Sequence, residues 1–389
     1  MPVLDRIREY QADMSSWRRD IHAHPEIAYE EVRTADVVAQ KLTEFGIPIH
    51  RGMGKTGVVG TLKVGNGNRA IALRADMDAL ELDEKNTFAH ASKHAGKMHA
   101  CGHDGHSTML LGAARYLAET RRFNGTVHFI FQPAEEGRNG AKAMIDDGLF
   151  EKFPVESVYG MHNMPGFDAG KILVRSGPMM ASADFVRIRI QGKGGHAAFP
   201  HQTVDPVLIA AQLIQAIQGI VARNVDPLEA GVVTIAMIHG GHARNIIPDD
   251  VELQGTARAF STKMQELIQD RLQKLCDGIA AAHGAKIELH YERLYPPTVN
   301  TEDETKEAAA AAAEVVGREN VQWNPPPAMG AEDFAWMLRE KPGSYVWIGN
   351  GAGEGGCMLH NPHYDFNDDI LPVGASYWVA LTERLLKVD

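Results

Sequence analysis

Short apolar runs alternate with amphipathic stretches along the first half of the chain. Stretches of helical periodicity such as STMLLGAARYLAET separate the apolar runs GVVGTLKV, AIALRADM, TVHFIFQP and SVYGMHN, which are rich in β-branched and aromatic residues. Strands and helices that alternate in this way are typical of an α/β domain. We therefore predict a mainly parallel sheet with helices on both faces.

From about Asp184 the pattern changes to the order strand, helix, strand, strand, helix, strand. This βαββαβ order is that of an α+β ferredoxin-like unit, which can be inserted into a host domain because its termini lie close together. The α/β pattern then returns and ends in a helix near GASYWVALTERLLKV. We expect a discontinuous first domain of residues 1–183 and 295–389 and an inserted domain of residues 184–294.

Composition and charge narrow the class of protein. A formal net charge of -11 over 389 residues opposes binding to a phosphate backbone, so no nucleic acid is expected as a partner. The N-terminal residues include no continuous apolar segment, and glutamines interrupt the run near Val207 to Ile220, so neither a secretory signal nor a membrane span is expected. Three cysteines fit a reducing compartment. We expect a cytoplasmic protein that handles a small molecule.

Candidate metal ligands follow the predicted strands. The segment MHACGHDGHS contains Cys101 and His103, and a thiolate and an imidazole two residues apart can face one divalent metal ion. The other candidates are Glu135 and Glu136 in PAEE, His162 in MHN and His360 in LHNPHYDFND. Each segment alone is also compatible with a His-rich loop, a solvated edge or a structural histidine. Together they supply enough ligands for a two-metal site at one edge of the sheet.

Eight segments in the same order resemble one enzyme family: RADMDAL, HACGHDGH, PAEEG, MHN, GKGGHAAFPH, NIIPD, GAEDF and LHNPHYDFND. They are similar to the M20-type aminoacylase/carboxypeptidase group of metallopeptidases, and most of all to its hippurate hydrolase-like branch of N-acyl-amino-acid amidohydrolases. The similarity covers essentially the whole chain. It implies hydrolysis of small-molecule N-acyl-L-amino acids, with a dipeptidase or carboxypeptidase as the near alternative.

The resemblance implies a role for each donor. Cys101 would bridge two divalent metal ions, zinc or manganese foremost, with cobalt or nickel also compatible with this ligand set. The remaining ligands would be His103, Glu136, His162 and His360. A hydroxide between the metals would attack the amide carbonyl, while Glu135 would take the proton of the water and pass it to the leaving nitrogen.

Residues outside the ligand set also receive roles from the resemblance. His196 of the inserted domain would stabilise the oxyanion, either within its own subunit or across a homodimer. Asn245 and Arg258 would bind the free carboxylate of the substrate. The inserted domain would thus act as lid and dimerisation domain. The carboxylates expected to orient ligand imidazoles are Asp78, Asp104 and Glu332, with salt-bridged structure as the alternative for each.

Two positions depart from the family pattern. Asp76 stands where other branches have a histidine, and because HACGH supplies the missing donor we expect Asp76 to lie outside the ligand set. Glu81 stands where a proline usually follows RADMDAL, which leaves the stiffness of that loop in doubt.

Two other readings of these residues remain. Cys101 could be a covalent nucleophile with His103 as its base, although residues two apart rarely meet side chain to side chain. The chain could also be a binding protein that holds metals without turnover.

Overall fold

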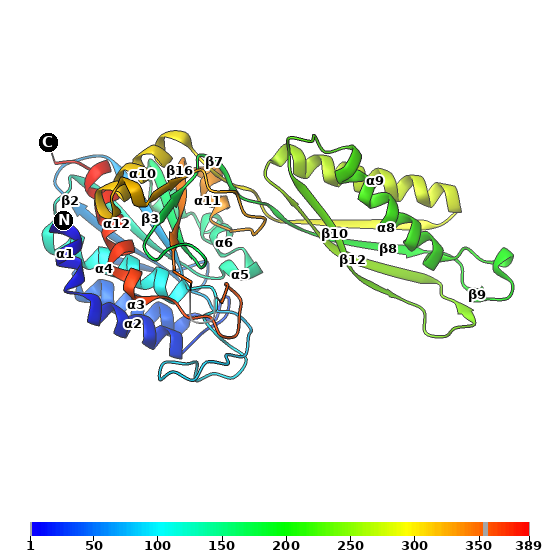
Figure 1. The fold of residues 1–389 in the computed structure, drawn as a ribbon, viewed down its shortest axis with the longest axis horizontal. Coiled ribbons are helices and arrows are strands. Elements are labelled where there is room, and N and C mark those ends of the chain that lie inside the picture. The colour runs from blue at the N-terminus through cyan, green and yellow to red at the C-terminus, as the bar shows by residue number, and fades with distance from the viewer. Residues whose placement is uncertain (1, 353–356, 389) are drawn as a thin grey trace. The chain divides into compact units, whose positions relative to one another are not determined.

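The computed structural model describes residues 2–352 and 357–388, and the chain divides into two compact units (Figure 1). The first unit consists of Met1–Gly177, Val299–Pro326 and Asp333–Asp389, and the second of Pro178–Thr298 and Pro327–Glu332. The second unit therefore extends a few residues beyond the range of 184–294 at both ends. It also includes a short later segment that no sequence pattern marked.

The first unit contains an eight-stranded mixed sheet. In spatial order its strands are β1 (Ile49–Met53), β2 (Gly57–Val64), β4 (Gly125–Gln132), β3 (Ala70–Asp76), β5 (Ser157–Met164), β16 (Gly343–Gly349), β6 (Ile172–Val174) and β15 (Val321–Trp323). The central strands β4, β3, β5 and β16 are parallel to one another, whereas β1, β2 and β6 join antiparallel neighbours. The predicted α/β class is confirmed, with antiparallel pairs confined to the flanks.

Helices cover this sheet, and their bounds are α1 (Pro2–Arg8), α2 (Gln11–Ala23), α3 (Val32–Glu44), α4 (His103–Thr120), α5 (Glu135–Arg138), α6 (Gly140–Asp146), α7 (Leu149–Lys152), α10 (Glu302–Val316), α11 (Ala335–Glu340) and α12 (Leu371–Leu385). Ile71, Leu73 and Ala75 of β3 belong to the main core, which also takes in α3, α4, α10 and α12. Side chains alternate along a strand, so Arg74 and Asp76 face the opposite side of the sheet. α6 contacts β4, and α11 contacts α6.

The second unit is an antiparallel four-stranded sheet with two helices. Its strand order is β10-β12-β8-β13, and its elements follow the chain as β8 (Ala183–Gln191), α8 (Pro206–Arg223), β10 (Gly231–Gly240), β12 (Asp250–Ala259), α9 (Thr262–His283) and β13 (Lys286–Tyr295). Sequence signals account for both helix starts, since the side chains of Asp205 and Ser261 accept backbone N–H groups at the first turns of α8 and α9. The predicted βαββαβ order is confirmed.

One helix departs from a sequence expectation. By length and composition alone, α8 is apolar enough to cross a membrane, in contrast to the expectation that no segment would be. Its buried residues include Ile209, Leu213, Ile217 and Ile220, which pack in the core of the second unit. The glutamines of α8 therefore mark the polar face of an amphipathic helix.

The remaining short elements are β7 (Gly177–Met180), β9 (Gly195–His196), β11 (Ile246–Ile247), β14 (Thr298–Asn300) and the 3-10 turns Pro200–Gln202, Arg318–Asn320 and Asp368–Ile370.

Candidate metal centre

Side chains able to bind a metal gather at the carboxyl ends of three strands of the first unit. β3 ends at Asp76, β4 leads into Glu135 and Glu136, and β5 carries His162. These strands are parallel neighbours in the order β4-β3-β5, so their carboxyl ends meet at one edge of the sheet. α4 also begins here, with His103 as its first residue.

Two glycines allow the HACGHDGH segment to pack closely. Gly102 has φ 93°, and a Cβ there would lie 2.2 Å from Oδ1 of Asn163. A Cβ on Gly105, in the first turn of α4, would lie 2.3 Å from the ring of Phe366. Cβ atoms do not approach other heavy atoms so closely, so both contacts require glycine.

The structure brings the five expected ligands together in two groups that share Cys101. Donor atoms of Cys101, His103 and His162 lie within 4.8 Å of one another, and so do those of Cys101, Glu136 and His360. Sγ of Cys101 lies 3.3 Å from Nε2 of His162, and Nε2 of His360 lies 3.3 Å from Oε1 of Glu136. Two donor groups with one common thiol suit a pair of bridged metal ions.

The hydrogen bonds of the two buried histidines direct one nitrogen of each ring into the site. Nδ1 of His103 lies 3.2 Å from Oδ1 of Asp78, and Nδ1 of His162 lies 2.6 Å from the backbone oxygen of Asn163. Each ring can donate Nδ1–H to an oxygen and keep its Nε2 lone pair for a metal. Across residues 2–352 and 357–388, Nε2 of His103 and Oε1 of Glu136 are buried and form no hydrogen bond, although Nε2 of His360 lies 3.3 Å from that oxygen. A cation bound here would satisfy both atoms, so the residues fit a metal.

Buried acidic groups give the site excess negative charge. Burial lowers the pKa of His103, but Asp76 and Asp78 outweigh burial and raise this pKa to about 10. Burial, reinforced by the carboxylate of Glu136, raises the pKa of the Cys101 thiol well above its usual value. A divalent cation is attracted by the same carboxylates and favours a deprotonated thiol ligand, so the charge of the site suits a metal.

Glu135 enters the site from a turn. Glu135 and Glu136 come after the end of β4 at Gln132, so the alternation of side chains along a strand does not separate them. The chain turns at Ala134, which has the left-handed angles φ 55° and ψ 42°. Glu135 is 6% exposed, and its Oε1 accepts a hydrogen bond of 3.3 Å from the backbone N–H of Asp333. A carboxylate oxygen of Glu135 lies within 4.8 Å of donor atoms of His103 and Glu136.

Comparison with known proteins identifies the family. Residues 72–384 match the family described as Peptidase family M20/M25/M40. The chain belongs to this family. A hippurate hydrolase of Campylobacter jejuni is 44% identical over 100% of both chains, and an N-acetylcysteine deacetylase of Bacillus subtilis is 37% identical over 98% of both. A solved dinuclear metal binding peptidase of the M20 family from Bacillus subtilis is 34% identical, covers 98% of this chain and 100% of its own, and has a TM-score of 0.85.

This M20 chain is accordingly a metal-dependent amidohydrolase that acts on linear amides. The family assignment based on the eight sequence segments is confirmed. The expected alternative of a non-catalytic binding protein receives no support, since the relatives named above are enzymes.

The carboxylates expected to orient imidazoles of the M20 site have different surroundings. Asp78 contacts His103 and also accepts the backbone N–H of Glu136 at 2.9 Å, so it connects two expected ligands. Asp104 instead lies 2.8 Å from Nδ1 of His22 and 3.3 Å from Nη1 of Arg18. In the described ranges it hydrogen-bonds to no expected ligand. Glu332 is the last residue of the second unit.

Asp76 has partners for both carboxylate oxygens. Oδ1 lies 2.6 Å from Nδ1 of His106, and Oδ2 accepts a hydrogen bond of 2.8 Å from Nη1 of Arg74. Oδ2 also lies 3.7 Å from Nε2 of His103. Sequence reasoning missed Arg74 and His106, although the HDGH spacing places His106 one turn of helix after His103 on the same face of α4.

The residues expected to stabilise the oxyanion and to bind the substrate carboxylate lie in the second unit. His196 is exposed on β9, where it pairs with Ile246 of β11, and its Nδ1 accepts the backbone N–H of Ala198 at 3.0 Å. The backbone oxygen of Asn245 accepts the N–H of Ala197 at 3.1 Å, so His196 and Asn245 belong to one small ribbon. Arg258 is half-buried on β12, and burial lowers the pKa of its guanidinium.

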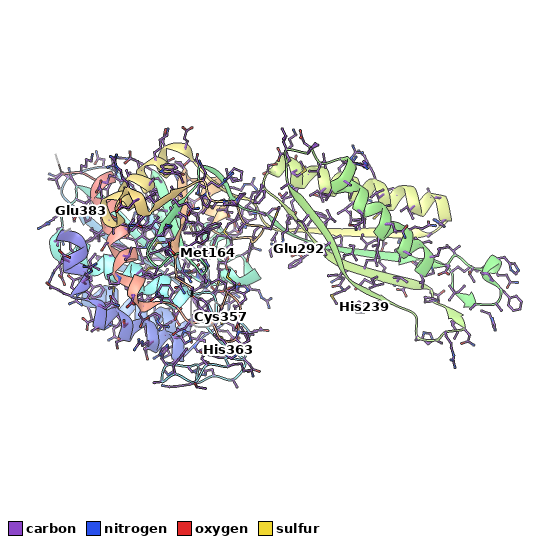
Figure 2. The ribbon with its side chains drawn as sticks, in the orientation of Figure 1. Met164, His239, Glu292, Cys357, His363 and Glu383 are labelled. Atoms are coloured by element: carbon purple, nitrogen blue, oxygen red, sulfur yellow. The ribbon has the colours of Figure 1, made fainter. Side chains whose placement is uncertain are left out.

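The two other cysteines belong to none of the donor groups formed by the described residues. Cys276 is buried in the core of the second unit. Cys357 and His363, both labelled in Figure 2, line a separate cavity of about 370 Å³ in the first unit. Glu81, the departure from the family pattern, is exposed.

Proposed function

We propose that this chain hydrolyses the amide bond of N-acyl amino acids of the hippurate or N-acetyl type at a pair of divalent metal ions. One observation carries the proposal: two donor groups share Cys101, and a carboxylate oxygen of Glu135 lies within 4.8 Å of donor atoms of His103 and Glu136. The 44% identity to a hippurate hydrolase supports the substrate class. A dipeptidase or carboxypeptidase activity is the alternative.

Five residues would hold the two metal ions, and zinc, manganese, cobalt and nickel all accept such a mixed set. When bound, the two ions would lower the pKa of a water molecule and polarise the amide carbonyl. Cys101 would contribute to both sites, His103 and His162 to one, and Glu136 and His360 to the other. This division follows the two donor groups that share Cys101, and Asp78 connects them because it contacts the ring of His103 and the backbone of Glu136.

Glu135 would move the proton. One of its oxygens accepts the N–H of Asp333, and the carboxylate is close to the donors yet buried from bulk solvent. A carboxylate so placed can take a proton from water and then donate it to the nitrogen of the leaving amino acid. His196, in its own subunit or in a partner subunit, would stabilise the oxyanion, and Asn245 and Arg258 would bind the substrate carboxylate.

The second unit would form a homodimer. Its strand β10 pairs with β12 on one side only and forms an edge of the four-stranded sheet. Met237 and Ile238 of this strand are 46% and 60% exposed, and an apolar unpaired edge readily pairs with another copy of the same strand. Sedimentation velocity at low protein concentration tests this interface, and a strictly monomeric active enzyme would exclude it.

The thiol route has little structural support. Burial raises the pKa of Cys101 well above its usual value, and a thiol that resists ionisation is a poor nucleophile at neutral pH. The nitrogen beside its sulfur belongs to His162 and not to His103, the base expected for this route. Chelation followed by metal addition separates the routes, because only the thiol route predicts activity after complete metal loss.

The Glu135→Gln variant tests the proposed role directly. We expect the turnover of hippurate and of N-acetyl amino acids to fall about 1,000-fold, within the range typical for loss of general acid–base catalysis. Metal content, measured by mass spectrometry of the purified protein, should equal that of the wild type, because Glu135 is not among the proposed ligands. Turnover close to that of the wild type would contradict the proton-transfer role.

A further inference from the structure

A buried glutamate far from Glu135 in sequence contacts the turn that carries it. Glu31 is 0% exposed and directly precedes α3. Its Oε1 accepts the backbone N–H of Tyr29 at 3.0 Å and that of Ala134 at 2.8 Å. Its Oε2 accepts the hydroxyl of Thr56 at 2.6 Å. The carboxylate therefore bonds to three separate segments of the first unit.

Helix capping does not account for Glu31. This residue occupies the N-cap position of α3, but its side chain accepts no N–H of that helix. Glu26 caps the helix instead, with Oε1 accepting the N–H of Arg33 at 3.0 Å and Oε2 that of Thr34 at 2.8 Å. Because Glu26 satisfies the first turn, the side chain of Glu31 is available to reach the Ala134 turn.

The Ala134 turn needs such a partner. Ala134 is fully buried in the left-handed region, which is unfavourable for a residue with a Cβ. Its N–H donates to Glu31, and its carbonyl accepts the N–H of Gly140 at 3.0 Å. Without Glu31, the N–H of Ala134 would be buried and unpaired, and the turn could satisfy it only by rotating. Such a rotation moves Glu135, the next residue.

Three consecutive residues of this turn are each held from a different direction. Ala134 is held through its N–H by Glu31, the Glu135 side chain by the N–H of Asp333, and Glu136 through its N–H by Asp78. Asp78 and Asp333 lie next to the metal site. None of the hydrogen bonds of Glu31 described above goes to an expected ligand. Among the described residues, the hydrogen bond to the backbone of Ala134 is the contact that connects Glu31 to Glu135, and the charge of Asp78 also acts on Glu31.

We propose that Glu31 is a positioning residue of the hydrolytic reaction, which fixes the left-handed turn at Ala134 so that the Glu135 carboxylate faces the reacting water. This inference rests on the proposed proton-transfer role of Glu135. A displacement of about 1 Å can slow an enzyme about 100-fold, so the contact should be visible in kcat.

Variants of Glu31 and Glu26 separate positioning from simple stability. Glu31→Met keeps the size of the side chain and removes the acceptor, and we expect kcat to fall about 100-fold with KM and metal content unchanged. Glu31→Gln keeps one oxygen for Ala134 and Tyr29, so its kcat should stay within about threefold of the wild type. Burial raises the pKa of Glu31 to about 7, so a neutral amide is a close replacement. Glu26→Met, the matched control, should unfold at lower urea with kcat unchanged.

Hydrogen exchange supplies a readout that does not depend on activity. Backbone N–H groups of residues 134–141 should exchange faster in Glu31→Met than in the wild type, while Glu31→Gln and Glu26→Met should match the wild type there. Wild-type kcat in metal-loaded Glu31→Met, or an equal loss of kcat in Glu31→Met and Glu26→Met, would overturn the proposal.

If Glu31→Met does not fold, Glu31→Asp replaces it, because its shorter carboxylate cannot reach Ala134. Equal wild-type kcat in Glu31→Asp and Glu31→Gln would then refute positioning.

The double variant Glu31→Met/Glu135→Gln distinguishes this inference from the proposed function. If Glu31 acts through Glu135, adding Glu31→Met to Glu135→Gln should lower kcat no further. Normal turnover in Glu135→Gln alone would refute the role of Glu135 whatever Glu31 does. A large loss in Glu135→Gln together with normal turnover in Glu31→Met would refute only the positioning role.

Discussion

Arg18→Met should destabilise the first unit by about 3 kcal/mol. The guanidinium of Arg18 is 1% exposed and donates to Asp368 at 2.6 Å, to Asp365 at 2.7 Å and to Asp104 at 3.3 Å. Removing one partner of a buried ion pair costs roughly 3–5 kcal/mol, because the other charge stays buried without compensation. Asp365 and Asp368 are partly exposed and can regain water, and His22 still contacts Asp104, so we expect the lower end of that range.

Tryptophan fluorescence during urea unfolding of the metal-free protein can measure this loss. All tryptophans lie in the first unit, so the signal is independent of the second unit: Trp17, Trp323, Trp336, Trp347 and Trp378. Arg51→Met is the matched control, since the pair between Arg51 and Asp36 is exposed and should be worth less than about 1 kcal/mol. A cost below about 1 kcal/mol for Arg18→Met would refute the reasoning, because the cluster would then be no stronger than a surface pair.

Three further predictions concern stability. Burial lowers the pKa of His22, but Asp104 and Glu84 raise it to about 9, above the unfolded value of about 6.5. The stabilisation that protonated His22 contributes is therefore fully present below pH 6.5 and is lost as the pH rises through 9. In His22→Gln, the free energy of unfolding measured by tryptophan fluorescence should depend less on pH over this range. An unchanged pH profile would contradict the assignment. Gly105→Ala should cost about 1–3 kcal/mol in the same assay, because its methyl group would meet Phe366, and a neutral result would show that the ring can move. Gly278→Ala, in α9 where an added methyl meets nothing within 4 Å, should stabilise the second unit by about 1 kcal/mol in thermal unfolding followed by circular dichroism, and a loss of stability there would contradict the helix propensity argument.

The features predictable from sequence are those that local patterns encode. Strand β8 alternates buried and exposed residues, and α8 and α9 begin with side-chain caps, so the βαββαβ order follows from short-range signals. The gathering of donors at the sheet edge was also predictable, because parallel strands bring their carboxyl ends together.

Contacts between distant segments were not predictable in this way. Glu31 and Ala134 are separated by 103 positions, and no periodicity relates them. Asp104 was expected to orient a ligand, but the structure places it against Arg18 of α2, a pairing that depends on how α2 packs on α4. The left-handed turn at Ala134 was missed because alanine does not mark such a conformation.

The position of β16 has a consequence for synthesis on the ribosome. β16 lies between β5 and β6 in the sheet, but it follows the whole second unit in the chain. While the second unit is being translated, β5 has an unpaired edge where β16 will later bind, and such edges promote aggregation of nascent chains. Cys101, His103 and His162 emerge before this interval and His360 after it. The first donor group is therefore complete in the growing chain long before the second, and early capture of one metal ion would stabilise the half-built sheet until its last central strand arrives.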